Sequence, residues 1–250
     1  MSATLWVVMP YVAITIFIAG HVWRWRADQF GWTSRTTQLL ESRLLRLGSP
    51  LFHLGVFMAI GGHVLGLLIP ASWTAAAGVS EGLYHAVSVT AGTIAGTMVV
   101  AGLALLLARR FANPRIRLVT TTMDKVLFAV LTVTIALGMA ETVGVNLLGG
   151  GYDYRDTVSA WFRGIFALRP DGQLMVHAPV VYQLHVICAL AFIGLWPFTR
   201  LVHVWSAPVA YLWRPYIVYR RRAKRLRVPA VPGRTSVTRR RLPATGGHDA

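Results

Sequence analysis

The stretch PLFHLGVFMAIGGHVLGLLI occupies residues 50–69 and contains no acidic residue, lysine or arginine. As a helix its twenty residues are about 30 Å long, which is the thickness of the hydrocarbon core of a lipid bilayer. In that core every backbone N–H and C=O must be paired within the protein, and a helix does this within one segment. The stretch therefore predicts a membrane-spanning helix that carries two histidines, His53 and His63.

Four further stretches have the same length and apolar character. They are residues 3–22, 82–108, 126–148 and 180–205. Over the whole chain of 250 residues, 55% are hydrophobic and 14% are charged, and the mean hydropathy is +0.53. A soluble domain carries about 25% charged residues. We therefore expect an all-α integral membrane protein, a bundle of five transmembrane helices.

The lysines and arginines predict the orientation of this bundle. Twenty-two of the 25 lie between the first and second spans, between the third and fourth, or from residue 200 onward. Cytoplasmic loops are enriched in these residues, so we expect the N-terminus outside and the C-terminus in the cytoplasm. A net charge of +16 that is bunched beside membrane spans favours contacts with lipid headgroups or a partner protein over nucleic-acid binding.

The composition of the chain changes near residue 222. Residues 1–222 hold the five spans, and residues 223–250 are rich in arginine, proline, glycine, serine and threonine. The latter composition predicts a basic, disordered cytoplasmic tail. Within the spanning part, residues 158–166 of the outer loop indicate a short helix at the membrane interface.

Four histidines lie inside the second and fifth spans at matching depths. In the predicted orientation His63 and His185 are near the outer surface, and His53 and His203 are near the inner surface. His185 and His203 are eighteen residues apart, which is five turns of an α-helix, so both should emerge on one face of the fifth span. Pro197 lies between them and should kink the helix, which makes this five-turn phase approximate. If the two spans are antiparallel neighbours, His63 meets His185 and His53 meets His203.

Such pairs are typical of a membrane cytochrome b that carries two haems. A neutral imidazole on each side of a haem iron fills both axial positions, which suits electron transfer rather than substrate binding. The alternative for each histidine is a hydrogen bond between neighbouring helices, in which case the chain is a haem-free anchor or transporter. The single cysteine, Cys188, excludes a cysteine-ligated iron–sulfur cluster held by this chain alone.

Several motifs resemble the gamma subunit family of respiratory nitrate reductase, over nearly the whole chain to about Arg222. They are GWTS at 31–34, GSPLFH at 48–53, GGH at 61–63, PRIR at 114–117 and PFTRLVHVWS at 197–206. The resemblance implies a multi-pass cytochrome b subunit of the bacterial inner membrane. It also implies an outer haem b on His63 and His185, and an inner haem b on His53 and His203.

The resemblance further implies a reaction and partners. A quinol, menaquinol or ubiquinol, is oxidised beside the outer haem, in the neighbourhood of Gly62. The electrons pass inward to the iron–sulfur clusters of a beta subunit and on to a molybdenum-containing alpha subunit, where nitrate becomes nitrite. The alternative is a related quinone-linked cytochrome b of another reductase or dehydrogenase complex, because such complexes differ mainly in the soluble partner.

The predicted quinol site departs from the family in one feature. Some members have a lysine at the start of the third span that contacts the quinol, whereas the sequence EGLYH at residues 81–85 contains none. Tyr84 and His85 are therefore the candidate donors, and Glu141, a carboxylate inside the fourth span near its outer boundary, is a candidate for proton exit. With Gly62 and His63, these residues form the predicted quinol site.

Overall fold

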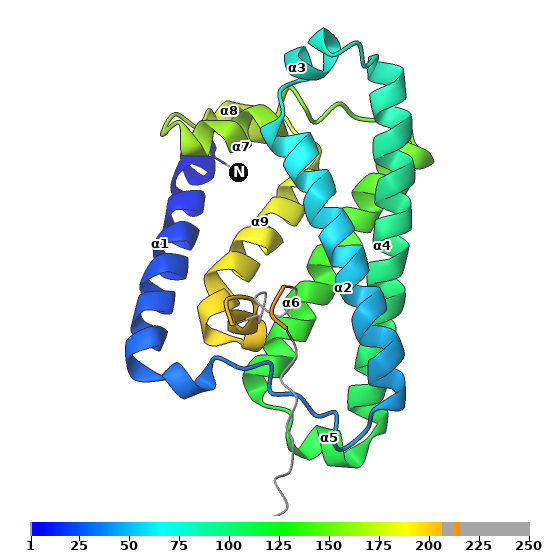
Figure 1. Ribbon diagram of the computed structural model, residues 1–250. Coiled ribbons are helices and arrows are strands. Elements are labelled where there is room, and N and C mark those ends of the chain that lie inside the picture. The colour runs from blue at the N-terminus through cyan, green and yellow to red at the C-terminus, as the bar shows by residue number, and fades with distance from the viewer. Residues whose placement is uncertain (1, 207–212, 216–250) are drawn as a thin grey trace, which may run out of the picture. The chain divides into compact units, whose positions relative to one another are not determined.

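The computed structural model describes residues 2–206 and 213–215, and within them all regular structure is helical (Figure 1). The long helices are α1 (Ala3–Ala27), α2 (Arg43–His63), α4 (Glu81–Ala112), α6 (Thr122–Met139) and α9 (Val180–Leu195). Wide π-helical turns continue two of them, η2 (Val64–Leu68) after α2 and η3 (Ala140–Leu147) after α6. The short elements are η1 (Gln29–Gly31), α3 (Ala71–Ala76), α5 (Pro114–Leu118), α7 (Val158–Phe166), α8 (Gly172–Val176), η4 (Trp196–Phe198) and η5 (Arg200–Val204).

Five helical segments are long and apolar enough to cross a membrane, which confirms the number predicted from the sequence. They are Ala3–Ala27, Arg43–Leu68, Glu81–Ala112, Thr122–Leu147 and Val180–Phe198. In each of them, at most 22% of the most apolar eighteen-residue window is buried inside the chain. Most of the apolar side chains therefore face outward, as expected of helices that contact lipid and unlike the apolar faces of helices in a water-soluble protein.

The second span begins earlier than predicted. Its helix starts at Arg43, and Pro50 lies inside it rather than at its first residue. An interior proline removes one backbone hydrogen bond, but this part of α2 packs tightly on α4. A Cβ placed on Gly48 would lie 3.0 Å from Cβ of Leu105. We attribute the continuation of the helix through Pro50 to this packing.

The fifth span ends earlier than predicted, and the expectation of a five-turn helical phase between His185 and His203 is wrong. The α-helix ends at Leu195, and Pro197 lies in the 3-10 turn η4. Thr199 is then fully extended, and His203 lies on the separate turn η5. Proline ends the helix because it lacks an N–H and its ring clashes with the carbonyl four residues earlier.

The loops gather at two opposite ends of the helices (Figure 1). We call the end with residues 28–42 and α5 the basic end, and the end with α3, α7 and α8 the aromatic end. The chain runs from the aromatic to the basic end in α1, α4 and α9, and back in α2 and α6. Helix α9 packs between α1 and α6, and α2 packs along α4.

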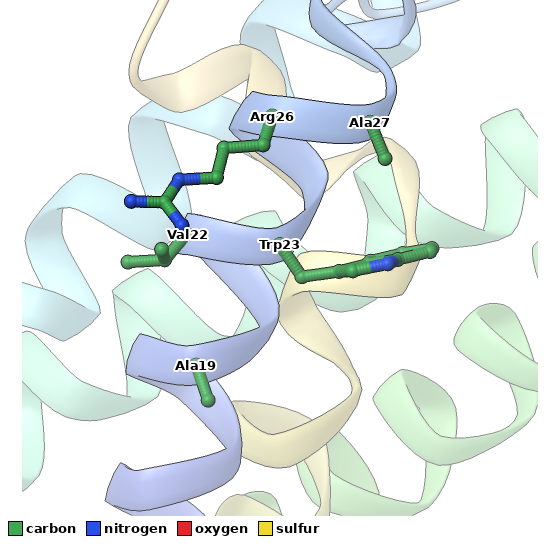
Figure 2. Close-up of a pocket in the computed structure, with 5 residues that line it drawn as sticks. All are labelled: Ala19, Val22, Trp23, Arg26 and Ala27. Carbon is green, nitrogen blue, oxygen red and sulfur yellow. The ribbon is translucent and has the colours of Figure 1, made fainter.

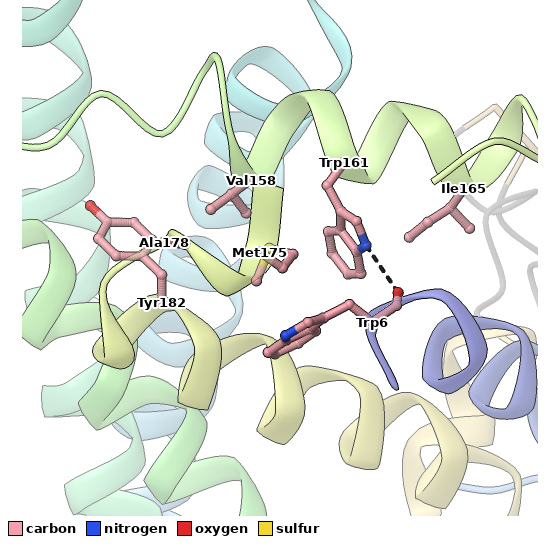
Figure 3. Packing of buried hydrophobic residues seen from close by; sticks show 7 residues of the cluster. All are labelled: Trp6, Val158, Trp161, Ile165, Met175, Ala178 and Tyr182. Carbon is pink, nitrogen blue, oxygen red and sulfur yellow. Dashed lines mark hydrogen bonds between the residues drawn. The ribbon is translucent and has the colours of Figure 1, made fainter. Parts of the chain in front are cut away.

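A buried cluster closes the aromatic end (Figure 3). It consists of Trp6, Val158, Trp161, Ile165, Met175, Ala178 and Tyr182. The indole N–H of Trp161 donates to the carbonyl of Trp6 at 3.0 Å, and their rings meet edge to face with centroids 6.0 Å apart. The helix predicted at residues 158–166 is thus present as α7, and its apolar face fixes it to the ends of α1 and α9.

The predicted domain boundary after residue 222 and the predicted tail 223–250 lie outside the described residues.

Candidate functional site

The structure brings His63 and His185 together near the aromatic end. His63 is the last residue of α2, and His185 lies in the second turn of α9. Their imidazole rings face each other with centroids 6.3 Å apart and planes inclined by 19°. These are the two residues that the sequence predicts as partners at one depth of the membrane.

His53 and His203 come together closer to the basic end. His53 projects from α2, and His203 from the turn η5. Their ring centroids are 6.5 Å apart, and their planes are inclined by 76°. The chain therefore holds two facing histidine pairs, one above the other, although His203 reaches its partner from a turn and not from the predicted helix.

In all four rings the Nδ1 atom lies within hydrogen-bond distance of a backbone carbonyl. The Nδ1 atoms of His53 and His63 each lie 2.7 Å from the backbone carbonyl four residues earlier in α2. Nδ1 of His185 is 3.0 Å from the carbonyl of Thr134 in α6, and Nδ1 of His203 is 2.6 Å from the carbonyl of Arg200. A carbonyl accepts a hydrogen bond from Nδ1–H, so the Nε2 lone pair of each neutral ring is available to a metal.

The spacing within each pair fits an iron atom between the rings. An imidazole nitrogen binds a metal at about 2 Å, so two such bonds, with about 1 Å from each nitrogen to its ring centre, separate the centroids by about 6 Å. Among the residues that the structure describes, no group of three or more His, Cys, Asp or Glu side chains could hold a metal ion. A pair of imidazole nitrogens suits an iron whose remaining ligands come from a macrocycle.

The glycines of α2 divide into two kinds. A Cβ on Gly55 would lie 2.8 Å from the backbone nitrogen of Val99, so this glycine permits close contact between α2 and α4. A Cβ on Gly61 or Gly62 would meet nothing within 4 Å. Open space therefore lies beside the predicted ligand His63, where a flat ligand needs room.

Gly138 of α6 was missed by sequence reasoning. A Cβ at this position would lie 3.0 Å from Cε1 of His185. Together with the carbonyl of Thr134 on the same helix, Gly138 forms the surface against which the His185 ring rests. A glycine inside an apolar span was a visible signal, but only the packing of α9 on α6 shows which histidine it serves.

Tyr84, one of the predicted quinol residues, belongs to a polar cluster at the aromatic end. Its hydroxyl is 3.2 Å from the hydroxyl of Tyr154, and the guanidinium carbon of Arg155 lies 3.9 Å from the centre of its ring. Arg155 is only 2% exposed and pairs with Glu81 at 3.2 Å, and it also donates to Thr74 at 2.7 Å. Sequence reasoning missed both Tyr154 and Arg155.

The remaining predicted quinol residues also lie at the aromatic end, and no described hydrogen bond joins them to one another. His85 is exposed on the first turns of α4, and a Cβ on Gly151 would lie 3.6 Å from its Nε2. Glu141 lies in the π-helical turn η3, where its Oε1 atom is buried and has no hydrogen-bond partner among the described residues. Gly62 and His63 are exposed on α2.

Two surface depressions lie away from these residues. The first, of about 510 Å³, is lined only by α1 residues near the basic end, and its Arg26 and Trp23 side chains point in different directions (Figure 2). The second, of about 480 Å³, lies between the loop around Glu41 and the end of α4 near Arg109. Neither depression is lined by a residue of a histidine pair, so the two histidine pairs remain the candidate site.

Comparison with known proteins gives consistent matches. The family model of the nitrate reductase gamma subunit matches residues 2–222. Nitrate reductase-like protein NarX of Mycobacterium tuberculosis is 52% identical over 223 residues, which are 89% of this chain and 34% of that protein. The chain thus spans about one third of that relative's length.

Two relatives match over nearly their whole length. The nitrate reductase gamma chain of Bacillus subtilis is 44% identical over 219 residues, 88% of this chain and 98% of that one. The respiratory nitrate reductase 2 gamma chain of Escherichia coli is 32% identical over 216 residues, 86% of this chain and 95% of that one. These matches confirm the resemblance drawn from the sequence motifs: the chain belongs to the nitrate reductase gamma subunit family.

Proposed function

We propose that this chain is the membrane-anchoring cytochrome b subunit of a respiratory nitrate reductase, and that it accepts electrons from quinol. The observation that carries the proposal is the presence of two facing histidine pairs with centroids 6.3 and 6.5 Å apart. Family membership supports it, because several relatives are named as nitrate reductase gamma chains.

The four histidines would bind haem iron through Nε2. His63 and His185 would hold one haem b, and His53 and His203 the other. When bound, the two haems supply one-electron carriers at two depths of the membrane. The backbone carbonyls at Nδ1 keep each ring in the tautomer that a metal requires, and they also limit its rotation.

In the proposed orientation the basic end faces the cytoplasm. Its loops carry Arg35, Arg115 and Arg117, and cytoplasmic loops are enriched in such residues. The N-terminus is then outside, and the aromatic end lies at the outer surface of the bacterial inner membrane. The predicted iron–sulfur beta subunit and molybdenum alpha subunit would bind at the basic end, beside anionic lipid headgroups.

Quinol oxidation would take place at the aromatic end, among Gly62, His63, Tyr84, His85 and Glu141. A quinol hydroxyl must give up its proton as its electron leaves, and an imidazole accepts a proton near neutral pH. His85 is the exposed imidazole on the first turns of α4. Tyr84 is held by Tyr154 and Arg155, so we assign it to the wall of the site and His85 to proton transfer.

The test is an optical spectrum of the purified full chain in its native complex, followed by reduction with a quinol analogue and reoxidation with nitrate. We expect two b-type haems per chain, reduced by quinol and reoxidised by nitrate. One haem or none per chain would contradict the assignment and favour a haem-free anchor or transporter. Reduction by quinol without reoxidation by nitrate would indicate a related cytochrome b that serves another reductase or dehydrogenase.

A further inference from the structure

We infer that the buried ion pair between Asp124 and Arg200 positions His203, and with it the inner axial ligand. The inference rests on the proposed function, since it concerns how one of the four proposed haem ligands is held. Asp124 and Arg200 are positioning residues in this account, because they act on the ligand only through the turn that carries it.

His203 differs from the other three histidines in its support. His53 and His63 donate from Nδ1 to carbonyls of their own helix, and His185 donates to a carbonyl of α6. The carbonyl that serves His203 belongs to Arg200, three residues earlier in the short turn η5. A short 3-10 turn has poorer hydrogen-bond geometry than an α-helix, so its own backbone hydrogen bonds hold it less firmly. The position of the Arg200 carbonyl therefore depends on the contacts that the Arg200 side chain makes with the rest of the chain.

The side chain of Arg200 is held by a carboxylate of another helix. Its Nε and Nη2 atoms lie 2.8 and 2.6 Å from Oδ1 of Asp124, whose side chain is 4% exposed. The backbone N–H of Thr121 donates to the Asp124 carboxylate, and the Thr121 hydroxyl accepts from the Asp124 N–H, which together cap the start of α6. The anchor of Arg200 is therefore itself fixed to the end of a long helix.

A second buried arginine holds the chain just before η5. Arg24 of α1 is 5% exposed, and its Nη1 donates to the carbonyls of Pro197 and Thr199 at 2.7 and 2.8 Å. The hydroxyl of Thr199 accepts from the N–H of Leu201, which fixes the first residues of the turn. The segment that follows the end of α9 is thus tied to α1 on one side and to α6 on the other.

Buried positive charge exceeds buried negative charge beside this segment. Arg110 also lies near Asp124, 3.6 Å from its Oδ2 atom, so two arginines share one buried carboxylate. Removal of one partner of a buried ion pair leaves the other charge uncompensated in a poorly solvated place. We expect the turn to move when the pair is disturbed, and the ring of His203 to rotate with it.

The decisive variant is Arg200→Lys in the full chain within its native complex. Lysine keeps the positive charge but cannot make the two-nitrogen contact with Asp124. Asp124→Asn is the second variant, since asparagine can still accept the capping hydrogen bond at the start of α6. For each we would measure haem content, midpoint potentials and the electron paramagnetic resonance signals of the ferric haems. These signals depend on the relative orientation of the two axial imidazole planes.

Glu41→Gln is the matched control. Glu41 lies 2.5 Å from Nε of Arg109, whose side chain is 4% exposed, and this pair also lies at the basic end. The described hydrogen bonds of the Arg109 side chain go to Glu41 and Thr37. Partial burial acts to raise the pKa of Glu41, but the Leu44 N–H and the Arg109 guanidinium outweigh it and lower the pKa below its ordinary value. The control therefore also removes an ionised pair.

We expect Arg200→Lys and Asp124→Asn to change the signal of the inner haem, with the outer haem unchanged. In Asp124→Asn the inner midpoint potential should also rise, because unbalanced positive charge favours the reduced iron. A change in Asp124→Asn but not in Arg200→Lys would show a through-space effect of charge and overturn the positioning role. Equal loss of both haems, or the same change in Glu41→Gln, would show a general folding role and overturn it as well.

His203→Ala separates this inference from the proposed function. If it removes the inner haem while Arg200→Lys and Asp124→Asn leave the inner signal unchanged, the positioning inference alone is wrong. If His203→Ala retains both haems with unchanged spectra, the proposed ligand assignment is wrong.

Discussion

The rings of His63 and His185 lie nearly parallel, with planes inclined by 19°, whereas those of His53 and His203 are inclined by 76°. The two pairs also differ in the elements that carry them. His63 and His185 both project from long helices, and His203 projects from a short turn that follows the end of α9. Two sites with the same ligand types therefore present different ligand orientations to an iron.

We accordingly expect two six-coordinate haems with distinguishable electron paramagnetic resonance signals. Substitution of His63 or His185 by alanine should remove one signal and about half of the haem, and substitution of His53 or His203 should remove the other. Haem content by pyridine haemochrome and the resonance spectrum of each variant check this. If His53→Ala and His185→Ala deplete the same haem, the antiparallel pairing is wrong.

Gly138 provides a test of the His185 support that leaves every ligand in place. A side chain in Gly138→Val would press on Cε1 of His185, which already lies 3.0 Å from the position of a Cβ. Overpacking of this kind costs about 1–3 kcal/mol, so we expect a substantial loss of the haem assigned to His63 and His185. Gly144→Val is the control, since a Cβ there meets nothing within 4 Å. Equal haem loss in both variants would contradict a specific role of Gly138.

The spans and the histidine pairs were predictable from the sequence because both depend on local composition. Apolar length defines a membrane helix, and the arginine pattern predicts how neighbouring helices run. Given antiparallel helices, the position of each histidine relative to the ends of its span places His63 and His185 near one end of the bundle, and His53 and His203 near the other. An unbroken fifth helix would separate His185 from His203 by about 27 Å, against about 15 Å between His53 and His63. In the structure the α-helix ends at Leu195, and His203 meets His53 from the turn η5.

The supports of the ligands were not predictable, because they arise from tertiary contacts. Neither the distance from Asp124 to Arg200 nor the carbonyl of Thr134 beside His185 has a signature in the sequence. Pro197 was visible and was expected to kink the helix, but the α-helix ends before it, at Leu195, and the backbone is extended at Thr199. The contact of Tyr84 with Arg155 also depends on how the loop between η3 and α7 packs on α4.

Substitution of the two kinds of glycine in α2 by alanine should have different effects on stability. In Gly55→Ala the new methyl group would approach the backbone of α4, with Val99 N only 2.8 Å away, and backbone cannot yield as a flexible side chain can. We expect a loss of about 1–3 kcal/mol, seen as a lower thermal unfolding midpoint in detergent. When both variants are compared in the haem-depleted chain, Gly61→Ala, whose methyl group enters open space, should not lower the midpoint. A midpoint in Gly55→Ala equal to that of the unaltered chain would contradict the close packing of α2 on α4.

The last prediction concerns the proton acceptor of the quinol site. His85 and His177 are both exposed histidines of the aromatic end, but only His85 lies on α4 beside the predicted site. We expect His85→Leu to slow quinol-driven haem reduction by about 10²-fold, the usual contribution of a general base, with both haem spectra unchanged. In His177→Leu, the matched control, quinol should reduce the haems at the normal rate. Stopped-flow reduction with a quinol analogue distinguishes the two. Normal kinetics in His85→Leu would exclude this imidazole, and normal kinetics also in Tyr84→Phe and Glu141→Gln would place quinol oxidation elsewhere in the bundle.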